Sequence, residues 1–193
     1  MSDTTQKKNL LIKASIFVKN NIKIFTILLI ILFSFLFTFL FYKNVQKNNN
    51  IEISEHYMQA SILIKQKKIF ESKLLLESII KKNHQIYSPL ALYMIIENEI
   101  ESDTSKIINF FDEILENSSL DKENLNLIKI KKGIYLINED NEELIIETLN
   151  PIINSNSVWR NSAINLISEY FISKKQKIKS DEYIKLLSNV TNN

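Results

Sequence analysis

The chain contains no cysteine, a single glycine (Gly133) and only two prolines among its 193 residues. Without cysteine it has no disulfide framework and no thiolate metal site. Phosphate-binding loops, dinucleotide-binding turns and nucleophile elbows each require more than one glycine, so none of these motifs is present. All-β folds also depend on frequent glycine and proline turns. The scarcity of both residues therefore favours a helical protein.

Charge is absent from one long stretch, residues 24–42, which also lacks glycine and proline. As a helix, roughly nineteen residues reach about 28 Å, close to the hydrocarbon thickness of a bilayer. The alternative is a buried core helix. A helix of this length that is apolar on all sides is uncommon in a small domain. The sequence therefore predicts one transmembrane helix over residues 24–42.

The flanks of this stretch predict its orientation. Five lysines and one aspartate precede it in residues 1–23, whereas only Lys43 and Lys47 follow it before Glu52. This asymmetry predicts a cytoplasmic N-terminus and a translocated C-terminal domain. A cleavable signal peptide has the same polarity but a shorter apolar region and a small-residue cleavage site. The exit over 41–47 has no such site, so we expect a retained signal-anchor.

The apolar stretch contains no ionisable side chain, which disfavours an ion path or proton relay. Ser34 and Thr38 have small-xxx-small spacing, a weak signal for helix contact within a membrane. Large phenylalanines surround both residues. A lipid-facing anchor is therefore the favoured interpretation, and Ser34 and Thr38 are the candidate membrane contacts.

The charge balance differs between the two parts of the chain. Residues 1–50 carry seven lysines and one aspartate, a net charge of +6, and the remainder carries −4. Nucleic-acid binding requires a basic surface on the folded part, so the acidic remainder disfavours that function.

Beyond a short polar linker at residues 43–50, the apolar spacing is helical to the end of the chain. Polar breaks divide residues 51–193 into eight helices of about 12–16 residues. The breaks are Lys65–Lys68, Lys81–His84, Glu101–Ser105, Asn117–Asp121, Asn138–Glu143, Asn154–Ser157 and Ser173–Lys177.

The helices repeat in pairs. Ala60 and Ser72 recur about 35 residues later as Ile95 and Ile107, and the later units place Leu144 and Ser180 in the register of Ser72. A helix pair every 34 residues or so is the tetratricopeptide period. We therefore predict an all-α protein, in which the transmembrane helix precedes a tetratricopeptide-like α-solenoid of about four helix pairs. The alternative is a generic helical bundle.

Two segments and the order of parts resemble a known family. The first segment is Tyr87–Met94 with Thr104–Leu115, and the second is Ser157–Ala163 with Lys179–Leu187. With the single N-terminal span, they resemble the ancillary Sec-translocon subunit (YfgM-like) family of bacterial membrane-anchored tetratricopeptide-like proteins. The resemblance implies anchoring in the bacterial inner membrane. It also implies a periplasmic domain that contacts the Sec translocon and periplasmic chaperones or newly exported clients. It implies no catalytic residue and no cofactor.

Side chains that could support catalysis or metal binding were weighed individually. Glu52 and His56 share a helix face, but no third ligand is near, so a solvated helix start is favoured. The acidic run 138–143 lacks the central glycine and the ligand spacing of a calcium loop. We therefore expect no metal, no cofactor, no small-molecule substrate and no enzyme activity.

Two functions remain open for the helical domain. The first is a scaffold whose concave surface receives a partner or client segment. By repeat position, Tyr57, Ile64, Leu92 and Glu99 are the candidate groove residues, and Arg160 is a further candidate because arginine is enriched at binding hot spots. The neighbouring Trp159 is favoured as a core residue. The second function is a self-associating structural envelope protein.

Overall fold

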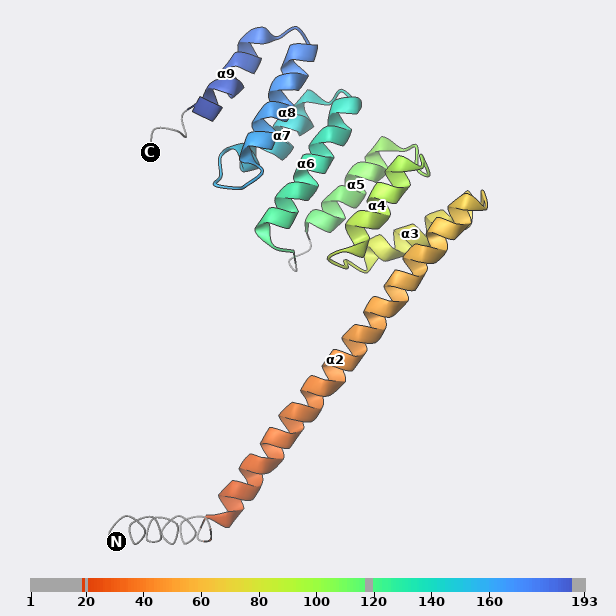
Figure 1. Ribbon diagram of the computed structural model, residues 1–193, viewed down its shortest axis with the longest axis vertical. Coiled ribbons are helices and arrows are strands. Elements are labelled where there is room, and N and C mark those ends of the chain that lie inside the picture. The colour runs from red at the N-terminus through yellow and green to blue at the C-terminus, as the bar shows by residue number, and fades with distance from the viewer. Residues whose placement is uncertain (1–18, 20, 117–119, 189–193) are drawn as a thin grey trace, which may run out of the picture. The chain divides into compact units, whose positions relative to one another are not determined.

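The computed structural model describes residues 19, 21–116 and 120–188, and these residues form helices and turns without a β-strand (Figure 1). The helices are α2 (Ile22–Lys65), α3 (Ile69–Lys81), α4 (Tyr87–Glu97), α5 (Thr104–Leu115), α6 (Lys122–Asn138), α7 (Glu142–Ile153), α8 (Arg160–Ser173) and α9 (Lys177–Ser188). The all-α prediction is confirmed for the described residues. The chain divides into two compact units, Met1–Glu52 and Ile53–Asn193.

The first unit contains the apolar stretch. Within the described residues, α2 is the one helix long and apolar enough to cross a membrane, and none of its apolar window is buried. Its large apolar side chains between Ile22 and Tyr42 are 48–74% exposed. Such exposure does not fit a buried core helix. Most of the basic segment 1–23 lies outside the described residues.

The predicted linker at residues 43–50 is helical and belongs to α2. This segment consists of lysine, asparagine, glutamine and valine, which all tolerate a helical conformation. It contains no glycine or proline that would end a helix. Polarity alone therefore did not end the helix.

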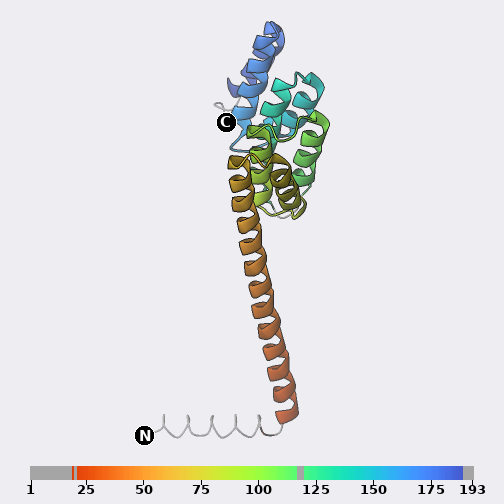
Figure 2. The same ribbon diagram turned by 90° about the vertical axis from the view of Figure 1, so that its right-hand side faces the viewer.

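In the second unit, six of the seven predicted breaks overlap a turn between two helices. Of the break Asn117–Asp121, residues 120–121 lie between α5 and α6, and residues 117–119 lie outside the described residues. The end of α2 and the helices α3–α9 make up the eight helices expected after residue 50. Consecutive helices from α3 to α9 pack against one another, as do α3 with α5 and α6 with α8. Figures 1 and 2 show these helices side by side, with the chain reversing direction at each turn.

Four of the turns have one geometry that lacks glycine. Lys67, Glu99, Asp140 and Lys175 each follow a helix with a positive φ of 50–61°. After each of them, the next backbone N–H donates to a carbonyl five residues back, as Ile100 does to Ile95 at 3.0 Å. This is the Schellman motif, which usually has glycine at the left-handed position. A repeat of 35 residues counted from Lys67 would place the second of these positions at Ser102, whereas the structure places it at Glu99.

These turns give the register of the helix pairs. The residues seven positions before each turn residue are all buried: Ala60, Leu92, Gly133 and Ser168. The residues that begin the buried face of the following helix are Ser72, Ile107, Ile145 and Ser180. The Ser72 hydroxyl donates to the Ala60 carbonyl at 3.1 Å, which confirms this pairing in the first unit.

This register corrects two sequence assignments. The counterpart of Ala60 is Leu92 rather than Ile95, and the counterpart of Ser72 in the third unit is Ile145 rather than Leu144. Turn length explains the first of these two corrections. Eight residues separate Glu99 from Ile107, whereas five separate the turn residue from its partner in the other three units.

The core of this unit has two clusters that meet at α6. Ile128 belongs to the first cluster, which extends back to Ile53, and Ile130 belongs to the second, which extends forward to Phe171. Gly133 lies where α6 approaches α7 closely, because a Cβ added there would lie 2.9 Å from Leu149 Cδ2. The helix α6 therefore contributes buried side chains to both clusters.

Candidate binding groove

A groove of about 250 Å³ lies where α4, α5 and α6 come together. Its lining residues are Tyr93, Ile96, Glu97, Phe111, Lys131, Ile134, Tyr135 and Asn138. Phe111 is almost fully buried, and its ring lies 6.1 Å from that of Tyr135. Ile134 is 42% exposed, so part of this apolar lining is open to solvent. The groove therefore offers an apolar floor that is accessible to a partner.

Tyr93 forms one wall of the groove together with a lysine. Burial raises the pKa of the Tyr93 hydroxyl to about 12, so it stays protonated and can donate a hydrogen bond at neutral pH. Lys131 Nζ lies 5.8 Å from the centre of the Tyr93 ring, within the range of a cation–π contact. The one basic side chain that lines the groove thus lies over an aromatic face.

Carboxylates lie around the end of the groove next to the turns. Glu97 lines it, and Glu139 accepts a 2.7 Å hydrogen bond from the Thr104 hydroxyl. The pKa of Tyr135 is raised chiefly by burial, and the negative charges of Glu139 and Asp103 add to that rise. Asp103 and Glu139 therefore act on a side chain that lines the groove, and together with Glu97 they form what we call the acidic rim.

The residues selected from sequence do not gather at this groove. Tyr57 is half-buried with its ring 5.6 Å from that of Tyr87, and burial is the main cause of its raised pKa, with the Glu97 charge next. Ile64 is half-buried against the first core cluster. Leu92 is fully buried, so it is a core residue in this structure. Glu99 is exposed and holds the left-handed turn position.

Sequence reasoning missed Tyr93, Ile96 and Ile134. The signal was present, because Tyr93 and Ile134 each come one position after an equivalent buried residue of the repeat. These buried residues are Leu92 and Gly133. With the correct register, both would have been assigned to one face of the domain.

Arg160 makes hydrogen bonds inside the domain. Its Nε donates to the Ile153 carbonyl at 2.8 Å and its Nη2 to the Leu186 carbonyl at 3.1 Å. It therefore satisfies carbonyls near the ends of α7 and α9, where cations are favourable. Trp159 is half-buried against the second core cluster, as the sequence favoured. Arg160 also lines a polar cavity of about 590 Å³ beside the 154–158 turn.

The two candidate membrane contacts lie on the exposed part of α2. The Thr38 hydroxyl donates to the Ser34 carbonyl of its own helix at 2.8 Å. This bond satisfies the hydroxyl without a partner helix, so Thr38 has no unmet need for a polar contact.

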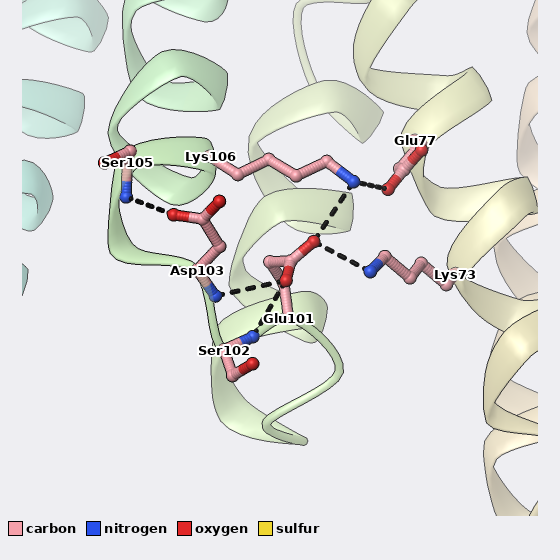
Figure 3. A network of polar contacts seen from close by, with 7 residues as sticks. All are labelled: Lys73, Glu77, Glu101, Ser102, Asp103, Ser105 and Lys106. Carbon is pink, nitrogen blue, oxygen red and sulfur yellow. Dashed lines mark hydrogen bonds and ion pairs between the residues drawn. The ribbon is translucent and has the colours of Figure 1, made fainter.

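An ionic network joins α3 to the turn between α4 and α5 (Figure 3). The Glu101 carboxylate pairs with Lys73 at 2.7 Å and Lys106 at 3.1 Å, and Lys106 also pairs with Glu77 at 2.7 Å. The backbone N–H groups of Ser102 and Asp103 donate to Glu101 at 2.9 and 3.1 Å. Figure 3 shows these groups converging on one carboxylate, whose side chain is 9% exposed.

These contacts lower the pKa of Glu101 to about 2, with the Lys73 hydrogen bond as the largest cause. A carboxylate that is charged throughout the physiological range and has so many donors is a poor general acid or base. The network is therefore suited to holding the longer α4–α5 turn in place.

His56 Nδ1 is buried without a hydrogen-bond partner among the described residues, whereas polar side chains at two of the turns make internal contacts. His84 Nδ1 accepts hydrogen bonds from the Ile86 and Tyr87 backbone N–H groups, both at 3.2 Å, and burial lowers its pKa. In the acidic turn, Asp140 pairs with Lys174 and Glu142 with Lys179. Over the residues that the structure describes, no group of three histidine or carboxylate side chains could hold a metal ion.

Comparison of the chain with protein-family models, with curated proteins and with solved structures found no match.

Proposed function

We propose that this protein is a membrane-anchored, non-enzymatic adaptor that binds polypeptide segments of partner or client proteins in the α4–α6 groove. The observation that carries the proposal is the accessible apolar floor around Ile134 and Tyr93. An apolar groove between helices is a common receptor for a helical or extended segment.

The proposed architecture of the helical domain is a tetratricopeptide-like α-solenoid of four helix pairs. In its support, four equivalent left-handed turn residues recur at intervals of 32, 41 and 35 residues, each followed by an equivalent buried position on the next helix. Stacked pairs of this kind bury their apolar faces only against one another and leave a long continuous surface for binding.

The proposed location is a bacterial inner membrane, crossed once by residues 24–42, with a cytoplasmic N-terminus and a periplasmic helical domain. The lysine excess in residues 1–23 and the exposed, uncharged helix support this assignment. A span without ionisable groups offers a neighbour only shape and packing, which suits an accessory subunit rather than a transporter.

The proposed partners are the Sec translocon at the anchor and periplasmic chaperones or newly exported proteins at the helical domain. The resemblance of Tyr87–Met94 and Ser157–Ala163 to the translocon-subunit family suggests these partners. The physical argument supports only the type of activity, which is protein binding.

Site-specific photo-crosslinking in cells tests these contacts separately. A photoreactive residue at Ile134 should crosslink a soluble protein, and one at Ser34 should crosslink a translocon subunit. Glu113, on α5 and outside the groove lining, is the matched control position. If Ile134 gives the same products as Glu113, the adaptor proposal is wrong at the groove. If Ser34 gives only lipid products, the translocon contact is wrong.

A second function, self-association as a structural envelope protein, is favoured by one observation. The first helical hairpin exposes large apolar side chains on both helices: Met58 and Ile62 of α2 and Phe70 and Leu74 of α3, each more than half exposed. A terminal repeat normally presents a polar outer face. A photoreactive residue at Phe70 that crosslinks mainly to a second copy, while Ile134 gives no partner, would favour this function.

A further inference from the structure

We infer that the α4–α6 groove selects segments in which an apolar stretch adjoins a lysine or arginine. The inference rests on the proposed function, since it names the chemistry of the segment that the same groove takes. It follows from two features that lie next to each other, the apolar floor and the acidic rim.

The floor supplies affinity without a preference for charge. Ile134, Ile96 and the ring of Tyr93 surround the buried Phe111. Removal of this surface from water by an apolar side chain is favourable in proportion to the area covered. Such a floor accepts many aliphatic and aromatic side chains, so it cannot by itself distinguish one apolar segment from another.

The rim supplies the preference for charge. Its three carboxylates are Glu97, Asp103 and Glu139, and within the described residues none of them is in a salt bridge. The hydrogen bonds that Asp103 and Glu139 accept, from the Ser105 N–H at 2.9 Å and from Thr104 at 2.7 Å, are both from neutral donors. The rim therefore keeps its negative charge.

The rim carries more charge than the nearby lysines can offset. Lys73 and Lys106 are paired with Glu101, and Lys131, whose Nζ lies 5.8 Å from the centre of the Tyr93 ring, is the one lysine that lines the groove. A positive side chain of an incoming segment would meet three unpaired carboxylates at one end of the groove. A negative side chain there would be repelled, so the field discriminates by sign.

A peptide-binding experiment tests this inference. It uses the full-length protein in nanodiscs of zwitterionic phosphatidylcholine, which has no net charge. The probes are three fluorescent peptides with the same apolar core, flanked by lysine, by glutamine or by glutamate. Fluorescence anisotropy at low and high salt gives the three dissociation constants. We expect the lysine-flanked peptide to bind about three- to tenfold more tightly than the glutamate-flanked one at low salt, and the difference to shrink at high salt.

Variants distinguish the rim from the floor. Glu97→Gln with Glu139→Gln should bring the lysine- and glutamate-flanked peptides within about twofold of each other, with the glutamine-flanked peptide unchanged. Glu143→Gln, which removes an exposed carboxylate outside the groove lining, should keep the full preference. Ile134→Ser should weaken all three peptides alike.

The outcomes separate the two levels of the argument. Equal binding of the three peptides to the unmodified protein, or a preference that persists in the Glu97→Gln and Glu139→Gln variant, would overturn the inference but leave the groove as a binding site. Failure of all three peptides to bind would overturn the proposed function at the groove. Loss of the preference in Glu143→Gln would place the selective charge elsewhere.

Discussion

The close approach of α6 and α7 at Gly133 leads to a prediction about Gly133→Ala. This substitution should lower the free energy of unfolding of the unmodified protein but raise that of the Leu149→Ala variant. Alanine is the better helix former by about 1 kcal/mol, so Gly133→Ala would stabilise an exposed helix. Here the new Cβ would lie 2.9 Å from Leu149 Cδ2 and 3.3 Å from Cγ, well inside normal contact distance. Leu149 is fully buried and has no solvent to move into.

The magnitude follows from these two opposed effects. Overpacking of a well-filled core costs about 1–3 kcal/mol. With the gain in helix propensity subtracted, Gly133→Ala should lower the free energy of unfolding by up to about 2 kcal/mol. Leu149→Ala alone should cost about 2–5 kcal/mol. In that background the methyl group no longer meets Leu149, so adding Gly133→Ala should raise stability by up to about 1 kcal/mol.

Denaturant unfolding of the four proteins of this cycle, followed by tryptophan fluorescence, measures the effect. The chain has one tryptophan, Trp159, which packs against the cluster that contains Leu149, so its emission reports on this region. If Gly133→Ala has the same effect in both backgrounds, the two sites are not coupled. The close approach of α6 to α7 would then be refuted.

Three further predictions concern the turns and the anchor. Glu101→Gln should flatten the acid dependence of the free energy of unfolding. The lowered pKa makes this carboxylate stabilising above about pH 4.5, and that contribution disappears as the pH falls towards 2. A variant that loses as much stability as the unmodified protein over this pH range would contradict the role of the network. Glu99→Gly should raise the free energy of unfolding by about 0.5–1 kcal/mol, because relief of the strain at the left-handed position exceeds the entropy that glycine loses on folding. The control Glu97→Gly, in the helix that precedes this turn, should lower the free energy of unfolding. A phosphatase fused after Asn193 should be active, and a reporter that fluoresces only in the cytoplasm should be dark at the same place. The reverse pattern would contradict the orientation, and a mature N-terminus near residue 43 would contradict the retained anchor.

Much of the fold follows from local patterns that the sequence carries directly. The apolar stretch 24–42 and the seven polar breaks could be located because helix periodicity and turn polarity act over a few neighbouring residues. The boundary at 43–50 was missed for the same reason. That segment is polar, but nothing in it ends a helix, and a sequence pattern registers polarity more readily than the absence of a stop.

The register of the helix pairs could not be read in this way. Three additional residues in the α4–α5 turn restore a spacing of 35 residues between Ser72 and Ile107. The same spacing applied to Ala60 gives Ile95, whereas the counterpart in the structure is Leu92. In the third unit the assignment was off by one residue, which rotates a helix face by about 100°. A period alone cannot distinguish a longer turn from a longer helix.

The sequence by itself determined the helical class, the apolar stretch, the sign of the charge on each part and the absence of glycine-dependent motifs, because each depends on composition or on neighbours along the chain. Only the tertiary structure decided that Leu92 is buried while Tyr93 lines a groove, that Arg160 bonds to two helix ends, and that Asp103 and Glu139 lie near Tyr135. Several of these relations join residues that are tens of positions apart, such as Arg160 with Leu186 and Asp103 with Tyr135. Their geometry depends on how adjacent helices approach each other, and that approach is set by close contacts such as Gly133 with Leu149 rather than by any local pattern.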